Sequence, residues 1–161
     1  MALRDEIRQS KPFPSPAVEA YLGILRTADL LLRDFEEFFR ARGLTEPRYN
    51  AIRILRGAGK DGLPCLEVAA RMVTRAPDIT RLLDGLERDG LVARRRDGPD
   101  RRVVRARATA KAVRLLDRIE GDLLAIHRRQ LGHMSAAELR TLNRLLDKAR
   151  RPATAGERTR P

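Results

Sequence analysis

Residues 80–92 read TRLLDGLERDGLV, and residues 93–108 continue as ARRRDGPDRRVVRARA. In the first stretch apolar residues recur at helical spacing, and Gly90 lies where a C-cap would end the helix. Upstream, Pro77 suits the first turn of this helix, and the carboxylate of Asp78 suits its positive dipole end. We expect the buried face of this helix to consist of Ile79, Leu82, Leu83 and Leu86.

The second stretch predicts two strands, over residues 91–96 and 102–108, which are joined by a loop that contains Gly98 and Pro99. Residues 91–107 hold seven arginines against two aspartates, a surplus of five positive charges. One or two charges suffice to protect an exposed strand edge, so this surplus favours contact with the phosphates and grooves of nucleic acid. In the second strand we expect one face to consist of Val104, Ala106 and Ala108, and the cationic face of Val103, Arg105 and Arg107.

A shorter helix is expected over residues 65–73, so that the chain reads helix, short turn, helix up to Gly90. The second helix of such a pair places its N-terminal residues on base edges in the major groove of DNA. Arg81 there has the geometry to bind guanine in a bidentate manner, and Thr80 suits a phosphate or a thymine methyl group. We expect the inward side chains of the shorter helix to be Leu66, Ala69 and Met72.

Two longer helices precede this pair. The first is expected to run from Ser15, as its N-cap, to about Ala41, with Gly43 as its C-cap. The second would begin with Thr45 as its cap and Pro47 in its first turn. Its inner face would consist of Tyr49, Ile52 and Leu55.

Two further helices follow the hairpin. In the first, apolar residues three and four apart predict a narrow seam of the coiled-coil type. Ser135 and Glu138 predict a capping box at the start of the second. Helices at both ends carry more apolar surface than the small central module can cover, so a twofold homodimer is the expected state. The seam consists of Leu116, Ile119, Leu123 and Ile126, and the apolar side of the last helix of Leu139, Leu142, Leu145 and Leu146.

The chain of 161 residues carries a formal net charge of +12 and a single cysteine. The charge favours a polyanionic partner, and the single Cys65 excludes a disulfide within the chain, which suits the cytoplasm. Cys65 lacks a second cysteine to resolve a sulfenic acid, so a small buried residue is favoured over a redox sensor. His127 and His133 lack the further ligands that a metal site needs. We therefore expect no metal site. We also expect no enzyme, no cofactor and no membrane contact.

The chain resembles the MarR family of winged-helix regulators over residues 15–150. The family pattern Thr-Arg-Leu-x-Asp-x-Leu-Glu-x-x-Gly-Leu-Val is matched by residues 80–92, and the Asp-x-Arg of its wing by Asp100-Arg101-Arg102. The family usually continues with Leu-Thr-x-x-Gly, whereas residues 108–112 read ATAKA, and Pro64 stands where the family often has Thr. Neither departure touches the proposed DNA surface.

The resemblance implies a mainly α-helical fold with a small β-hairpin wing, that is, a winged helix-turn-helix with N- and C-terminal dimerisation helices. It also implies a homodimeric repressor on a pseudo-palindromic operator, with two recognition helices about 34–36 Å apart in successive major grooves and the wings along minor grooves. Asp100 would orient Arg102 for the minor groove. Many relatives are released from DNA by a small anionic or phenolic ligand. Nothing in the sequence identifies such an effector, although Arg26, Arg33 and Tyr49 are candidates to line its pocket.

Two alternatives to a sequence-specific regulator stay open: a non-specific nucleic-acid-binding protein and a winged-helix module for protein contacts. Binding of RNA or single strands would favour aromatic platforms within the basic surface, whereas all six aromatic residues lie outside the hairpin. A module for protein contacts would have little use for seven arginines. Double-stranded DNA is therefore the preferred partner.

These expectations divide the chain into five parts: an arm over residues 1–14, a dimerisation helix over 15–43, a DNA-binding region over 44–109, dimerisation helices over 110–151 and a disordered tail over 152–161. The residues predicted to contact DNA are Thr74, Arg75, Pro77, Asp78, Thr80, Arg81, Arg94, Arg95, Arg96, Asp100, Arg101 and Arg102.

Overall fold

A computed structural model describes residues 2–74, 78–96 and 103–151 of the chain. The chain divides into two compact units, Met1–Leu123 and Leu124–Pro161. Within the described residues, no helix combines the length and the apolar character needed to cross a bilayer.

The first unit begins with the single-turn helix α1 (Leu3–Glu6) and the long helix α2 (Pro16–Arg40). The predicted start of α2 is confirmed, because the Ser15 hydroxyl accepts a hydrogen bond from the N–H of Val18 at 3.4 Å. Its end follows the prediction as well. Gly43 has φ +64°, and the N–H of Leu44 donates to the carbonyl of Phe39, as in a Schellman cap.

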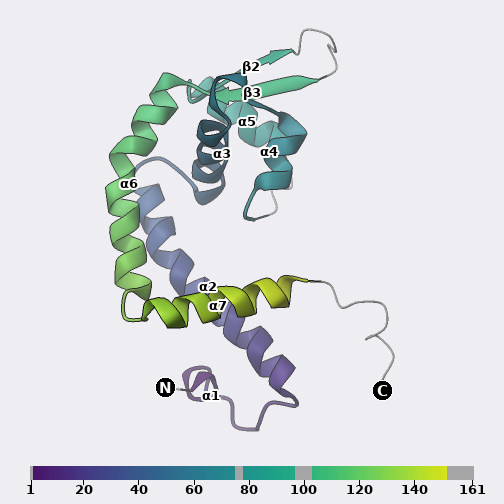
Figure 1. Ribbon diagram of the computed structural model, residues 1–161, viewed down its shortest axis with the longest axis vertical. Helices are drawn as coiled ribbons and strands as arrows, with labels where there is room; N and C mark the ends of the chain where they lie inside the picture. The colour runs from purple at the N-terminus through teal and green to yellow at the C-terminus, as the bar shows by residue number, and fades with distance from the viewer. Residues whose placement is uncertain (1, 75–77, 97–102, 152–161) are drawn as a thin grey trace. The chain divides into compact units, whose positions relative to one another are not determined.

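Three helices and a short strand form the central part of this unit (Figure 1). Helix α3 (Glu46–Gly57) is followed by the single 3-10 turn η1 (Gly59–Asp61) and by the strand β1 (Leu63–Pro64). Helices α4 (Cys65–Arg71) and α5 (Ile79–Arg88) then make the predicted helix, turn, helix. Gly90 ends α5 at φ +68°, and the N–H of Leu91 donates to the carbonyl of Leu86.

Of the three residues predicted on the inward face of α4, only Met72 packs against the core, and Leu66 and Ala69 do not belong to it. Leu66 is 81% exposed, whereas Val68 is fully buried. The side chains that pack against the core are Cys65, Val68 and Met72, which share a face at helical spacing. A helix of seven residues makes fewer than two full turns, so its sequence fits more than one face.

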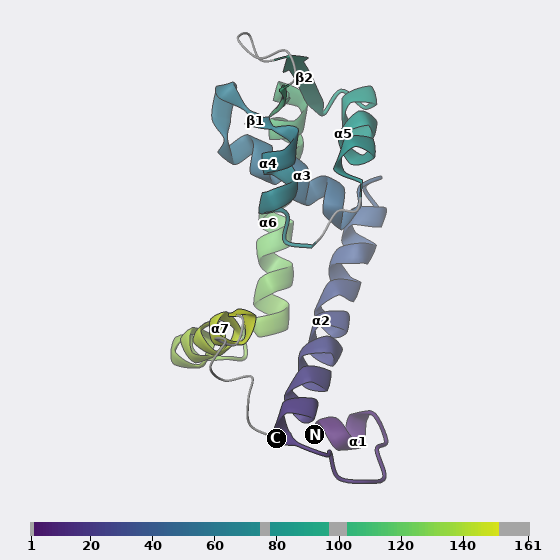
Figure 2. The same ribbon diagram turned by 90° about the vertical axis from the view of Figure 1, so that its right-hand side faces the viewer.

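The predicted hairpin is confirmed, and it forms part of a three-stranded antiparallel sheet with the order β1-β3-β2 (Figure 2). Strand β2 (Val92–Arg96) pairs with β3 (Val104–Ala108), with Arg94 opposite Ala106. Strand β1 pairs with the other edge of β3, with Leu63 opposite Ala106. Gly62 leads into β1 at φ +64°, where a Cβ atom would lie 2.2 Å from the carbonyl oxygen of Ala106.

A single hydrophobic core joins these elements. Leu83 and Leu86 of α5 are fully buried, as the sequence predicts, and Ala106 supplies the buried face of β3. Helix α6 (Ala110–Leu131) begins directly after the sheet. The predicted seam residues Leu116 and Ile119 belong to this core, so that part of the seam packs within its own chain. Buried residues from all these elements make up the core: Phe39, Leu44, Ala51, Ile52, Leu55, Val68, Leu83, Leu86, Leu91, Val92, Ala106, Ala112, Leu116, Ile119 and Leu123.

The second unit holds the end of α6 and helix α7 (Ala136–Arg150). The predicted capping box is confirmed: the N–H of Glu138 donates to the Ser135 hydroxyl, and the N–H of Ser135 donates to the Glu138 carboxylate at 2.8 Å. The two hydrogen bonds to Ser135 hold the pKa of Glu138 below its ordinary value. No residue of α7 is buried, and Leu145 on its apolar side is 51% exposed.

Candidate nucleic-acid interface

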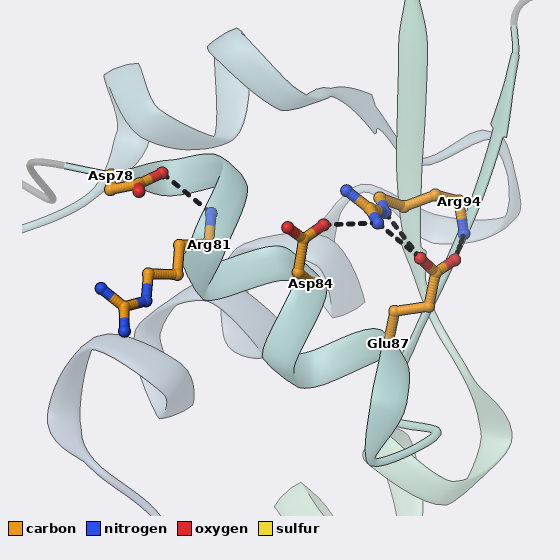
Figure 3. A network of polar contacts seen from close by, with 5 residues as sticks. All are labelled: Asp78, Arg81, Asp84, Glu87 and Arg94. Carbon is orange, nitrogen blue, oxygen red and sulfur yellow. Dashed lines mark hydrogen bonds and ion pairs between the residues drawn. The ribbon is translucent and has the colours of Figure 1, made fainter.

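The N-terminal end of α5 presents an exposed polar surface. The Asp78 carboxylate caps this helix by accepting a hydrogen bond from the N–H of Arg81 at 2.9 Å (Figure 3). Asp78 is therefore the residue that precedes the helix, rather than part of its first turn. Thr80 and Arg81 are both exposed, and the Arg81 guanidinium has no ion pair within the described part of the chain. The end of α5 is thus fixed by its cap while two side chains suited to base or phosphate contact stay accessible.

Arg94 ties strand β2 to α5. Its Nε donates to Oε2 of Glu87 at 2.8 Å, and its backbone N–H donates to Oε1 of the same carboxylate at 3.0 Å. Its Nη2 lies 2.6 Å from Glu87 Oε2 and 2.6 Å from Asp84 Oδ1 (Figure 3). The hydrogen bonds from Arg94 hold the pKa of Glu87 below its ordinary value, and the bond to Glu87 raises the pKa of Arg94. The guanidinium that the sequence places among the DNA contacts is therefore occupied by two carboxylates.

The outward face of the hairpin is cationic, as the sequence predicts. Arg95 is exposed and stands directly opposite Arg105, whose Nη1 donates to the carbonyl of Gly62 at 3.3 Å. Arg96 at the end of β2 and Arg107 on the outward face of β3 are exposed as well. Like charges directly opposite each other destabilise a strand pair.

The turn before α5 is attached to another helix. The Thr74 hydroxyl, which is exposed, donates to the Glu46 carboxylate at the start of α3 at 3.3 Å. Five of the twelve predicted DNA contacts, and the proposed pair of Asp100 with Arg102, lie outside the described residues and stay predictions. These five are Arg75, Pro77, Asp100, Arg101 and Arg102.

The three residues considered for an effector pocket lie in different settings. Arg33 pairs with Asp29 at 2.6 Å on the surface of α2, and Arg26 lies 3.8 Å from the same carboxylate. Tyr49 stacks on Phe39 with the ring centroids 4.8 Å apart, and burial raises the pKa of its phenol. Arg26 also lies 3.6 Å from the carboxylate of Glu6. A role of these three residues in effector binding stays a prediction.

Neither redox nor metal chemistry gains support at this surface. Cys65 is half-buried at the start of α4, and burial raises the pKa of its thiol, which disfavours the reactive thiolate. Among residues 2–74, 78–96 and 103–151, no three His, Cys, Asp or Glu side chains are grouped so as to hold a metal ion.

The sequence did not indicate which arginine of the hairpin would turn inward. Asp84 and Glu87 lie three residues apart on α5, so they offer one carboxylate surface to a cation from a neighbouring element. The register of β2 places Arg94 on the inward face with Val92, where that surface lies. The paired carboxylates were the one signal in the sequence that pointed to such a contact.

Comparison with known proteins agrees with this arrangement. The model of the MarR family matches residues 44–104, which span α3 to the start of β3. The HTH-type transcriptional repressor YetL of Bacillus subtilis is 32% identical over 95 residues, which is 59% of this chain and 57% of the length of YetL. The homoprotocatechuate degradative operon repressor of Escherichia coli is 25% identical over 78% of this chain and 84% of its own length.

Solved structures that resemble this chain belong to the MarR family as well. A MarR transcription factor from Planctomyces limnophilus is 41% identical, with a TM-score of 0.66 over 84% of this chain and 98% of that protein. A mutant of Escherichia coli MarR in complex with operator DNA shares the fold, with a TM-score of 0.75 at 20% identity over 94% of this chain and all of that one. With its winged helix-turn-helix fold, the chain belongs to the MarR family of transcriptional regulators.

Proposed function

We propose that this MarR-family regulator represses transcription by binding a pseudo-palindromic operator in double-stranded DNA as a homodimer. The observation that carries this proposal is the end of α5, where the Asp78 cap leaves Thr80 and Arg81 exposed, beside a hairpin with a cationic outward face. The protein acts by binding rather than by catalysis, in the cytoplasm where the chromosome lies.

Exposed apolar residues support the dimer. On α2, Tyr21 is 61% exposed, and Ile24 and Leu25 are nearly half exposed. On α7, in the second unit, no residue is buried and Leu145 is exposed. Apolar surface of this extent stabilises association when a second copy covers it. In a twofold dimer the same residues of both chains form the interface. Residues 15–43 and 110–151 are therefore proposed to form the dimer, and residues 44–109 to bind DNA.

The roles at the DNA follow from exposure and charge. Arg81 reads a guanine in the major groove from the N-terminal end of α5, and Thr80 contacts a phosphate or a thymine methyl group. Arg95 and Arg96 contact phosphates. Arg94 instead holds the hairpin against α5, because Asp84 and Glu87 already bind its guanidinium. The remaining predicted contacts flank these residues: Thr74, Arg75, Pro77 and Asp78 at the turn, and Asp100, Arg101 and Arg102 at the wing.

A small anionic or phenolic molecule is proposed to release the operator. The Escherichia coli relative is named as the repressor of a homoprotocatechuate degradative operon. A ligand that favours a spacing of the two α5 helices unsuited to DNA shifts the population away from the bound state. Titration of a panel of aromatic carboxylates and phenols into the preformed protein–DNA complex tests this part of the proposal.

The function itself is tested by selection of bound duplexes from a random pool with the full chain. Recovery of two inverted half-sites at one separation supports the proposal. Recovery of duplexes without a shared sequence would instead favour a non-specific binder, and absence of DNA binding at low salt would favour a module for protein contacts. Arg81→Met should remove the selected preference at one base pair of each half-site, whereas the control Lys60→Met, which removes one exposed charge outside α5 and the hairpin, should leave the selected sequence unchanged.

A further inference from the structure

The C-terminal end of α5 is attached to two other helices. The carboxylate of Asp89 binds the guanidinium of Arg48 on α3, and the backbone carbonyl of Asp89 accepts a hydrogen bond from Lys111 Nζ on α6 at 2.7 Å. The carbonyl of Gly90 accepts a hydrogen bond from the Thr109 hydroxyl at 2.8 Å. The N–H of Thr109 then donates to the carbonyl of Leu91 at 3.0 Å. Three consecutive residues after α5 are thus held by neighbouring elements.

These contacts complete the cap of α5. The last carbonyls of a helix lack partners within it, and here the N–H groups of Gly90 and Leu91 satisfy those of Glu87 and Leu86. The carbonyls of Asp89 and Gly90, the two residues that follow the last helical residue Arg88, accept from Lys111 and Thr109. The positive charge of Lys111 also suits the negative dipole end of α5.

Thr109 also caps the start of α6. Its hydroxyl accepts a hydrogen bond from the N–H of Ala112 at 3.3 Å, as an N-cap does at the start of α6. The first turns of α6 are fixed in the core, because Ala112 and Leu116 are buried. The residues that end α5 and the start of α6 therefore form one joint, in which Thr109 bonds to Gly90 after α5 and caps α6, and Lys111 of α6 bonds to the C-cap residue Asp89 of α5.

We propose that Thr109 and Lys111 are positioning residues, which fix the direction of α5 relative to α6 and thereby set the separation of the two operator half-sites. This inference rests on the proposed function, in which α6 belongs to the dimer and α5 reads the major groove. Helix α5 has 10 residues, so it is about 15 Å long. A tilt of about 15° at the joint would move its N-terminal end by roughly 4 Å, which is close to one base-pair step.

A cap that served stability alone would not affect half-site separation, so separation is the discriminating measurement. The random-duplex selection is repeated with the full-length double variant Thr109→Val/Lys111→Met, which removes both side-chain bonds to the residues that end α5, Asp89 and Gly90. Thr109→Ser/Lys111→Arg keeps a hydroxyl and a cation at the joint and is the matched control. Lys60→Met controls for the loss of one positive charge. Thermal unfolding of each variant is measured alongside.

The wild-type chain should select half-sites at a single separation. We expect the double variant to select at least two separations that differ by one base pair. The affinity ratio between the preferred separation and one changed by a base pair should fall from more than about tenfold to less than about threefold. Both controls should retain the wild-type separation and ratio. If the double variant does not fold, Lys111→Met alone, which leaves the Thr109 cap intact, should show the same broadening to a smaller degree.

A folded double variant that selects the wild-type separation with the wild-type affinity ratio would overturn this inference and leave the proposed function standing. Failure of the wild-type chain to select paired half-sites would overturn the proposed function, and this inference with it. The two failures are therefore distinguishable in one experiment.

Discussion

Replacing Arg94 with methionine tests whether this arginine holds the hairpin against α5 or contacts DNA. Methionine keeps an unbranched apolar side chain but removes the guanidinium that binds Glu87 and Asp84. Glu87→Gln is the complementary change, since it keeps the shape of the acceptor and removes its charge. The double variant closes a thermodynamic cycle, which isolates the interaction between the two side chains.

The expected coupling lies between that of a surface ion pair and that of a buried one. Hydrogen bonds to charged groups contribute about 1.5–3 kcal/mol when shielded from water, whereas exposed ion pairs contribute about 0.2–1 kcal/mol. The side chain of Arg94 is 23% exposed, and that of Glu87 is 39% exposed. Because of this partial exposure, we expect a coupling of about 1–1.5 kcal/mol between them at pH 7. Arg94→Met alone should cost about 2 kcal/mol, because it also leaves Asp84 and Glu87 facing each other without a cation.

The coupling between Arg94 and Glu87 should weaken as the pH falls. The pKa of Glu87 in the folded chain lies below its ordinary value of 4.5, so the unfolded chain binds a proton at this residue more readily than the folded chain. The stabilisation is therefore fully present above pH 4.5 and is lost as the pH falls from there through the lowered pKa. Urea unfolding of the four proteins at one fixed concentration measures the coupling, and the fixed concentration is needed because a dimer gains stability by mass action.

DNA binding provides the second measurement. Arg94→Met should leave the salt dependence of binding to the selected duplex unchanged, whereas Arg96→Met should lower the slope of log K against log salt by about 1.8, as expected for two phosphate contacts, one from each protomer of the dimer. A coupling below about 0.3 kcal/mol at pH 7 would refute the argument from the ion pairs. An equal loss of slope in both variants would show that Arg94 contacts a phosphate after all.

Three further predictions concern the recognition residue, the sheet and the dimer. Arg81→Met should weaken operator binding by about 1–3 kcal/mol for each half-site and abolish the preference at one base pair of each half-site, measured by competition with duplexes changed at single positions. Gly62→Ala should destabilise the chain by about 2–4 kcal/mol in urea unfolding, because its Cβ would lie 2.2 Å from the carbonyl oxygen of Ala106, whereas Gly57→Ala, with no atom within 4 Å of its Cβ, should cost nothing. Leu25→Glu should convert the dimer to monomers in sedimentation velocity, and an unchanged sedimentation coefficient would show that this face of α2 lies outside the interface.

Local rules were sufficient for the features that depend on a few consecutive residues. Gly43 and Gly90 were predicted to end helices, and both adopt the positive φ that a Schellman cap needs. The alternation over residues 103–108 predicted the inward face of the second strand, where Ala106 is buried, because a strand has only two faces.

Features that depend on tertiary packing could not be predicted in the same way. Strand β1 has two residues, and only its pairing with β3 makes it a strand. The face of α4 was wrong at Leu66, because a helix this short has no clear periodicity. Part of the predicted seam of α6, including Leu116, packs within its own chain, since spacing shows that a face is apolar but not what covers it. The hairpin arginines were alike in sequence, and only the packing of β2 on α5 distinguishes Arg94 from Arg95.

The stoichiometry of the DNA complex tests the central claim most directly. Sedimentation equilibrium of the full chain would be measured with a duplex that carries the selected site and with a duplex that carries one half-site. We predict two chains on each full site and an affinity for the half-site that is at least about 100-fold weaker, because a dimer that engages both half-sites gains the second contact without a second association step. One chain per full-site duplex, or equal affinity for the two duplexes, would contradict the account.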